Sequence, residues 1–184
     1  MRKVLIIGCG GIGSFLIPLL DMTGLYKLDV YDPDIVEVKN ITYQNFDSDS
    51  VGDNKVDSIA RRFSCVTAHP YPILTAKQIK GYDLVVCCAD NLVIRRTMYN
   101  SKVKWLDLRA QGRNSVLVSY EENPDLFNEL TNGPEGSFSC QGDAWNGSSK
   151  GLHFMHVTAA GIGAEWIQRW FNDEDTFTNR MIAG

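Results

Sequence analysis

The sequence predicts an α/β fold in which a mostly parallel sheet carries helices on both faces. Short runs of β-branched residues alternate with helix-like segments through the first two thirds of the chain, as they do in strand–helix–strand units. A cluster of glycines lies between the first expected strand and the first expected helix. The chain has 184 residues, of which 44% are apolar, and this is enough to bury one sizeable core.

The apolar runs define the expected elements in chain order. Strands are predicted at residues 3–8, 27–31, 65–71, 83–88 and 104–108, with 115–120 extending the sheet. Helices are predicted at residues 11–22, 51–63, 92–101 and 152–171. Asn91 directly precedes the third helix, where its side chain is well placed to cap the helix N-terminus.

The organisation of the chain favours a single domain over residues 1–184. No internal repeat or linker marks a second domain. Residues 121–151 are rich in Asn, Gly, Ser and acidic side chains and are predicted to form a long loop, which inside a compact domain is usually functional or mobile. Residues 172–184 are predicted to form a tail.

Charge and hydropathy exclude several classes of partner. The formal net charge is -4 and the charges of both signs are interspersed, so there is no basic stripe for nucleic acid or for an anionic membrane. No apolar run approaches the roughly 20 residues of a membrane span. The first residues enter a strand pattern at once, which leaves no room for a signal peptide. We therefore expect a cytoplasmic protein.

The cysteines argue against a disulfide framework and against a zinc site. They form an odd set without any C-x-x-C pair. Most are expected to be buried reduced thiols. The set comprises Cys9, Cys65, Cys87, Cys88 and Cys140.

The glycine cluster is the first feature that indicates chemistry. Gly8, Gly10, Gly11 and Gly13 follow a strand and open a helix, so that backbone amides and the positive helix end can face a phosphate. Asp32 lies about 20 residues further on, at the end of the second strand, where a carboxylate binds a ribose hydroxyl. These features indicate a Rossmann-like nucleotide site. The alternative is a glycine turn that serves only helix–sheet packing.

The stretch that follows distinguishes between nucleotide-binding families. Up to Asp32 a nicotinamide-dependent oxidoreductase fits equally well. Beyond it, the sequence resembles the ThiF/MoeB/HesA family, which includes the adenylation domains of ubiquitin-activating enzymes. The resemblance runs from Val4 to about Asn100 in matching order and near-matching spacing, and continues more loosely into the last helix. The residues that carry it are Tyr31 to Asn40, Gln44, Val51, Gly52, Lys55, Asp90, Asn91 and Arg95.

The resemblance implies an activity, cofactors and a partner. Members of this family use ATP and magnesium to adenylate the C-terminal glycine carboxylate of a ubiquitin-like or sulfur-carrier protein, and they release pyrophosphate. A homodimer is expected as well. A second hypothesis is a noncatalytic relative that binds nucleotide or a ubiquitin-like partner. An NAD-dependent oxidoreductase is the third.

Site roles follow from the same resemblance. The glycines line the nucleotide, Asp32 holds the ribose, Asn40 and Lys55 face the phosphates, and Asp90 binds magnesium. Attack by a carboxylate on the α-phosphorus brings anions together, so cations are needed to neutralise the developing charge. Alternatively, Lys55 is a solvated charge and Asp90 caps a helix. The nucleotide-binding set also includes Asp34, Gln44 and Asn91.

Two further features concern charge and nucleophiles. The family usually reads Asn-x-x-Arg-Gln where this chain has Tyr43 in place of the arginine, and tyrosine cannot neutralise charge. Arg109 and Arg113 are candidates to supply the positive charge that the usual arginine would carry. Alternatively, each is a surface charge or an ion-pair partner. Cys140 is a candidate catalytic thiol that would attack the acyl-adenylate, provided that it has thiolate character; His153 and His156 are the neighbours that could approach it after folding.

Overall fold

The computed structural model describes residues 1–132, 139–142 and 145–184. The strands form one sheet, in the order β3-β2-β1-β4-β5-β6-β7. Its strands are β1 (Arg2–Ile7), β2 (Tyr26–Tyr31), β3 (Val66–His69), β4 (Leu84–Cys87), β5 (Trp105–Gln111), β6 (Asn114–Ser119) and β7 (Asn179–Ala183). The helices are α1 (Gly13–Asp21), α2 (Lys55–Arg62), α3 (Leu92–Tyr99), α4 (Pro124–Thr131) and α5 (Met155–Phe171), with short 3-10 turns η1 (Asn40–Thr42), η2 (Ser48–Ser50) and η3 (Ser149–Gly151).

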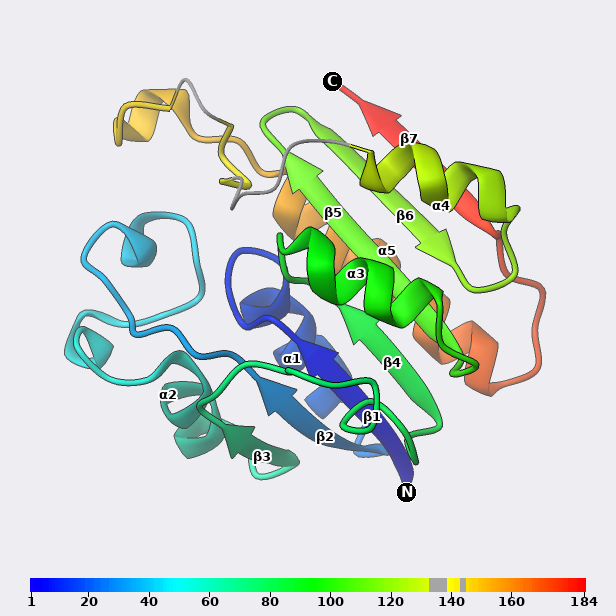
Figure 1. Ribbon diagram of the computed structural model, residues 1–184. Helices are drawn as coiled ribbons and strands as arrows, with labels where there is room; N and C mark the ends of the chain where they lie inside the picture. The colour runs from blue at the N-terminus through cyan, green and yellow to red at the C-terminus, as the bar shows by residue number, and fades with distance from the viewer. Residues whose placement is uncertain (133–138, 143–144) are drawn as a thin grey trace.

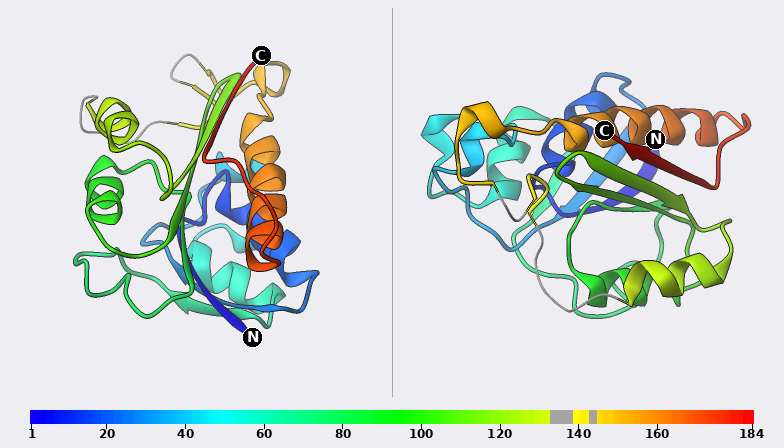
Figure 2. Two further views of the ribbon diagram at one scale, coloured as in Figure 1. Left: turned by 90° about the vertical axis from the view of Figure 1, so that its right-hand side faces the viewer. Right: turned by 90° about the horizontal axis from the view of Figure 1, so that it is seen from above.

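The first five strands are parallel, and β6 and β7 continue the sheet in antiparallel pairing. In Figure 1 the sheet crosses the molecule from β3 to β7, with α3 and α4 in front of it. Figure 2 shows the sheet edge-on between this layer and the layer of α1, α2 and α5. The predicted α/β fold, a mostly parallel sheet with helices on both faces, is confirmed.

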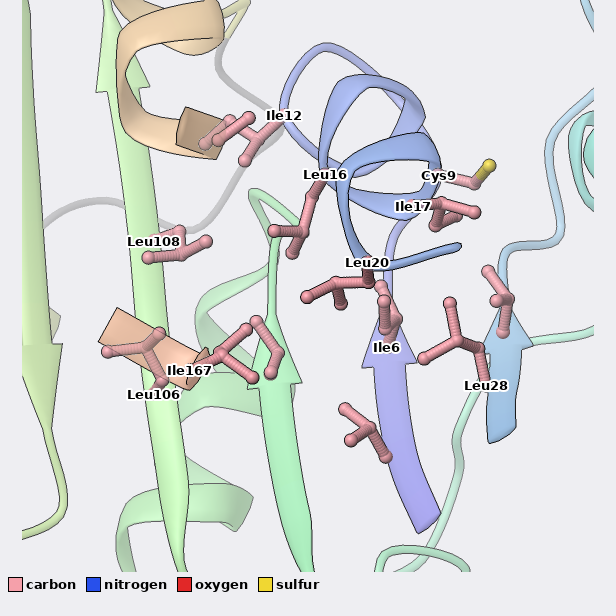
Figure 3. Close-up of a cluster of buried hydrophobic side chains, with 14 of the residues drawn as sticks. Ile6, Cys9, Ile12, Leu16, Ile17, Leu20, Leu28, Leu106, Leu108 and Ile167 are labelled. Carbon is pink, nitrogen blue, oxygen red and sulfur yellow. The ribbon is translucent and has the colours of Figure 1, made fainter. Parts of the chain in front are cut away.

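The larger core lies between the sheet and the layer of α1, α2 and α5. Leu16, Ile17 and Leu20 of α1 point down onto the strands, facing Ile6 and Leu28, as Figure 3 shows. These positions recur at helical spacing, so α1 presents one continuous apolar face. Strand β1, in the interior of the sheet, is buried on both faces because Leu5 and Ile7 belong to the second core, beneath α3 and α4. A strand buried on both sides explains the uninterrupted apolar run at Val4–Ile7.

Two predictions about chain organisation were wrong. The stretch 121–151, predicted as one long loop, contains helix α4. Its Asn123 side chain accepts a hydrogen bond from the Asp125 amide at 3.0 Å, and Pro124 occupies the first turn, where a missing N–H costs nothing. The stretch 172–184, predicted as a tail, contains β7, which pairs with β6.

The two helix ends nearest the glycine turn also differ from expectation. The helix predicted at 51–63 begins at Lys55, because the residues before it form the η2 turn and a bridge between Ile35 and Asn54. The helix predicted at 11–22 begins at Gly13. The cap at Asn91 is confirmed: its side chain accepts hydrogen bonds from the Val93 and Ile94 amides at 2.8 and 3.2 Å.

Close backbone packing explains two of the glycines. A Cβ atom at Gly13 would lie 2.1 Å from the carbonyl oxygen of Gly8. At Gly8, which has a φ of +94°, a Cβ atom would lie 2.7 Å from the Ala89 amide nitrogen. The start of α1 is therefore packed directly onto the residue that follows β1. That residue, Gly8, is in turn packed onto the residues that follow β4. Only glycine allows this approach.

A buried ion-pair network joins α3 to β5. Asp107 is fully buried and accepts hydrogen bonds from Arg95 at 3.0 Å, from Arg109 at 2.9 Å and from the Tyr99 hydroxyl. Arg109 also donates to the Leu130 carbonyl oxygen at 2.7 Å, which ties in the end of α4. Burial alone would raise the pKa of Asp107, but the two guanidinium groups overcome this and lower it. The carboxylate is thus held ionised between two cations.

We predict that Gly13→Ala destabilises the protein by about 3 kcal/mol, because the added methyl group would overlap the Gly8 carbonyl oxygen. Gly161→Ala is the matched control. A Cβ atom there meets open space within α5, so alanine should stabilise the helix by about 0.5 kcal/mol or more. Urea unfolding monitored by circular dichroism gives both values. Equal effects at the two positions would contradict the packing described above.

We also predict that Asp107→Ala lowers the free energy of unfolding by about 3–5 kcal/mol, because it leaves the buried guanidinium group of Arg95 and the partly buried one of Arg109 without their carboxylate. The control is Asp53→Ala, which breaks an exposed ion pair with Arg61 and should cost less than about 1 kcal/mol. Chemical denaturation of both variants measures the difference. A loss at Asp107 as small as the loss at Asp53 would show that the network contributes little.

Candidate functional site

One cavity of about 1140 Å³ opens at the carboxyl ends of the parallel strands. It lies where the strand order reverses, since β1 pairs with β2 on one side and with β4 on the other. In open α/β sheets this switch point is where ligands bind. All but one of the predicted site residues line the cavity: Gly8, Gly10, Gly11, Asp32, Asp34, Asn40, Gln44, Lys55, Asp90, Asn91 and Cys140.

The exception is Gly13, which serves the packing of α1 on Gly8 described above. The other glycines of the turn lie on the cavity surface. Next to Gly10 a Cβ atom would meet nothing closer than the Gln44 amide group at 3.8 Å, so the space above this residue is open to a ligand. The N-terminus of α1 follows directly and adds its positive dipole end. The turn therefore has the geometry of an anion-binding site.

Asp32 fastens the glycine turn to the end of β2. Its carboxylate accepts a hydrogen bond from the Cys9 amide at 2.6 Å and another from the Asp34 amide at 2.9 Å. The side chain is nearly buried, and burial raises the pKa of Asp32, while Lys55 and these two amides oppose the rise. The carboxylate faces the cavity beside the turn, as a ribose-binding group would.

Lys55 lies at the start of α2 and points into the cavity. Only 6% of the residue is exposed, so it is not the solvated charge that the alternative required. Its ammonium group lies 2.9 Å from Asp34 Oδ2. Burial acts to lower the pKa of Lys55, but Asp32 and Asp34 outweigh burial and raise it. Lys55 is therefore a buried, charged ammonium group next to the glycine turn.

The segment from Asn40 to Gln44 forms another wall of the cavity. The Asn40 side chain accepts a hydrogen bond from the Glu37 amide at 2.9 Å, and the Asn40 carbonyl oxygen accepts one from the Gln44 amide at 2.7 Å. Gln44 is buried, and within the described part of the chain its Oε1 atom has no hydrogen-bond partner. A buried acceptor without a donor is costly. Gln44 Oε1 is therefore available to accept a hydrogen bond from a ligand in the cavity.

Asp90 and Asn91 follow β4 at the cavity edge. Asn91 faces the cavity and also caps α3, so capping and a site role are compatible. Asp90 supplies a carboxylate at the carboxyl end of β4, across the switch point from Asp32. Magnesium in proteins takes one or two carboxylates and completes its shell with phosphate oxygens and waters. Among the described residues no group of three or more acidic, histidine or cysteine side chains could hold a metal ion.

The two arginines proposed to replace the missing positive charge lie in different places. Arg109 lines the cavity within the Asp107 network, whereas Arg113 lies beyond β5 and is not on the cavity surface. Arg95, which the resemblance included without a role, also lines the cavity. Tyr43 faces the cavity too, with its ring edge-on to Trp145 at a centroid distance of 5.2 Å. The cavity lining thus includes two guanidinium groups, those of Arg95 and Arg109, as well as the uncharged Tyr43.

Cys140 lies against the glycine turn. A Cβ atom at Gly11 would be only 2.4 Å from its sulfur atom. Burial raises the pKa of the Cys140 thiol to about 11, so the sulfur is protonated at neutral pH and lacks the thiolate character that nucleophilic attack requires. Ser137 and Phe138, which precede Ser139 and Cys140 in the sequence, lie outside the described part of the chain.

His156 was expected only as a possible neighbour of Cys140, and sequence reasoning missed its actual contacts. Its Nε2 atom lies 2.8 Å from the Tyr43 carbonyl oxygen, and its Nδ1 atom lies 3.4 Å from Gln141 Nε2. Burial lowers the pKa of His156, so the imidazole is neutral at pH 7. No spacing in the sequence indicated that residues 43, 141 and 156 would meet.

No helix in the described ranges has the length and apolarity to cross a membrane.

Curated proteins match part of this chain in sequence. The molybdopterin-synthase adenylyltransferase of Salmonella typhimurium is 29% identical over 148 residues, which cover 70% of this chain and 58% of the relative. Ubiquitin-like modifier-activating enzyme 5 of Drosophila grimshawi is 31% identical over 115 residues, 51% of this chain and 29% of that enzyme. The adenylyltransferase and sulfurtransferase MOCS3 of Mus musculus is 34% identical over 102 residues, which cover 50% of this chain and 22% of that protein. The chain spans 22–58% of the length of these relatives.

A solved structure matches the whole chain. The crystal structure of E. coli MccB with AMPCPP and MccA superposes with a TM-score of 0.74 at 20% identity, and the match covers 100% of this chain and 61% of that one. At this identity the likeness shows the fold alone. The model of the ThiF family matches residues 1–164. On the combined evidence of the family model, the fold and the motif residues, the chain belongs to the ThiF family.

Proposed function

We propose that the chain is an ATP-dependent adenylyltransferase that activates the C-terminal carboxylate of a ubiquitin-like or sulfur-carrier protein. The observation that carries this proposal is that the glycine turn, Asp32, Lys55 and Asp90 line one cavity at the switch point of the sheet. The relatives with adenylyltransferase in their names support the reaction class. Because the chain spans only part of their length, its substrate and partner are part of the proposal.

The chemistry assigns each group a task. The substrate carboxylate attacks the α-phosphorus of ATP, the acyl–phosphate bond forms, and the bond to the β-phosphate breaks to release pyrophosphate. We assign the ribose to Asp32 and the phosphates to the glycine turn, Asn40 and Lys55. The buried ammonium group of Lys55 would stabilise negative charge more effectively than an exposed one, because little water screens it. We assign the phosphate-bound magnesium to Asp90, where it would neutralise charge on the leaving pyrophosphate.

Three further assignments complete the proposal. Gln44 and Asn91 contact the nucleotide from either side of the glycine turn, and Gln44 Oε1 accepts a hydrogen bond from it. Asp34 holds the Lys55 ammonium group in place. Cys140 is assigned no covalent step, because its thiol is protonated at neutral pH. We further propose a cytoplasmic homodimer, in keeping with the sequence-based expectation.

A noncatalytic nucleotide-binding relative is the second candidate. The observation that favours it is Tyr43, which stands where the family usually has an arginine on the phosphates. Such a protein would bind ATP without exchanging pyrophosphate. The third candidate, an NAD-dependent oxidoreductase, differs in that it would bind NADH more tightly than ATP.

We predict that the protein binds ATP with magnesium more tightly than NADH, and that Lys55→Met weakens ATP binding by about 10- to 100-fold through loss of a charged hydrogen bond. Isothermal titration calorimetry on one preparation measures both ligands. Lys102→Met, at an exposed lysine outside the cavity, is the control and should leave ATP binding unchanged. Tighter binding of NADH would refute the assignment.

ATP–pyrophosphate exchange tests catalysis. With ubiquitin-like and sulfur-carrier proteins ending in glycine as substrates, we expect exchange by the wild type, a loss of about 100-fold in Asp90→Asn, and no change in Asp49→Asn, at an exposed carboxylate. Chelation of magnesium should abolish exchange. ATP binding without exchange for any carrier would favour the noncatalytic relative.

Tyr43→Arg should raise the exchange rate by about 10-fold, because an arginine neutralises phosphate charge that a tyrosine cannot. The hydrogen bond from His156 should persist, since it is made to the backbone of residue 43. Circular dichroism verifies that the variant is folded. An unchanged or lower rate in a folded variant would mean that Arg109, Arg95 or the partner already supplies this charge.

A further inference from the structure

Gln141 and His156 form a buried polar pair that the proposed chemistry does not use. Each is only 1% exposed. The pair lies between three walls of the cavity, namely the glycine turn, the segment from Asn40 to Gln44, and the segment from Ser139 to Gly142. Buried polar groups that are fully hydrogen-bonded fix a unique arrangement of the segments that carry them. The pair is therefore in a position to set the shape of the cavity.

Gln141 is bound to the backbone of His153 through both atoms of its amide group. Its Oε1 accepts from the His153 amide at 2.8 Å, and its Nε2 donates to the His153 carbonyl oxygen at 2.9 Å. The second hydrogen of Nε2 points to His156 Nδ1 at 3.4 Å. These bonds hold residues 139–142 against the residues that lead into α5.

His156 continues the chain of hydrogen bonds to the next wall. A carbonyl oxygen can only accept, so Nε2 must carry the proton that it donates to Tyr43 at 2.8 Å. In the neutral ring Nδ1 is then an acceptor, which matches the donor that Gln141 offers. A protonated ring would place a second donor against the Gln141 amide. The arrangement thus requires the neutral form, and burial favours that form.

The segment that this pair holds is the one in contact with the glycine turn. The Cys140 sulfur lies against Gly11, and the Cys140 carbonyl oxygen accepts a hydrogen bond from the Gly112 amide at 3.0 Å. Movement of Gln141 would withdraw Cys140 from the turn. Movement of His156 would release the wall that carries Asn40 and Gln44.

We propose that Gln141 and His156 are positioning residues that lock the segment from Ser139 to Gly142 and the segment from Asn40 to Gln44 against the glycine turn, and so preform the phosphate end of the cavity. We call this set of contacts the lock. The effect of the lock on nucleotide binding rests on the function proposed above, whereas the existence of the lock does not. Neither residue touches the reacting atoms.

The lock is tested by the accessibility of Cys140. In the folded protein, alkylation by a maleimide followed by peptide mass spectrometry reports the Cys140 thiol separately from the other four. His156→Phe and Gln141→Leu should each raise its rate of labelling by about 10-fold, because loss of a buried hydrogen bond raises the opened fraction by this factor. His156→Gln keeps a donor for the Tyr43 carbonyl oxygen and should restore a rate near that of the wild type.

His153→Phe is the matched control. It is the same substitution at the neighbouring histidine, whose imidazole makes no hydrogen bond to any described residue and whose backbone alone binds Gln141. Its Cys140 labelling should equal that of the wild type. Unchanged labelling in both His156→Phe and Gln141→Leu would overturn the proposal, and so would equal acceleration in His153→Phe. Two lock variants keep the test valid if one of them fails to fold.

Calorimetry with ATP and magnesium gives the second readout. We expect the dissociation constant to rise by about 10-fold in His156→Phe and Gln141→Leu, and to stay near the wild-type value in His156→Gln and His153→Phe. Faster labelling with unchanged ATP affinity would refute the link to the phosphate site. If the wild type binds no ATP, the proposed nucleotide site fails, and the labelling of Cys140 still decides whether the lock exists.

Discussion

The carboxylate of Asp32 is the constraint on which the rest of the site depends. By accepting from the Cys9 amide at 2.6 Å it fastens the glycine turn to the end of β2. A nearly buried carboxylate needs such partners, because burial alone disfavours its charge. Lys55 supplies the compensating positive charge. The first and second strands, the turn and α2 are therefore held in register by one charged cluster at the cavity edge.

A second charged cluster organises the opposite wall. Asp107 is buried between Arg95 and Arg109, so α3 and β5 meet through charge as well as through apolar packing. Together the cluster carries one more positive than negative charge, and both arginines line the cavity. The cavity thus has buried cations on both sides of the switch point, an arrangement suited to a ligand with several negative charges.

Local sequence signals predicted the features that depend on neighbouring residues. The glycine turn, Asp32 and Asp90 could be placed because each lies or begins within three residues of the end of a strand, and parallel strands end at one edge. Helix α4 and strand β7 were missed because short polar elements are stabilised by tertiary contacts, such as the pairing of β7 with β6. The contact of His156 with Tyr43 joins residues 113 positions apart, and its contact with Gln141 joins residues 15 positions apart. No local pattern encodes them.

The protonated thiol of Cys140 has an electrostatic consequence for the turn that it contacts. With its pKa raised to about 11, the sulfur fills space beside Gly11 without adding a negative charge that would repel phosphate oxygens. The position therefore suits small, uncharged side chains, and serine or alanine would leave the local potential unchanged. An acidic residue of similar size would place an anion in the same space, and this anion would repel the phosphates and weaken nucleotide binding.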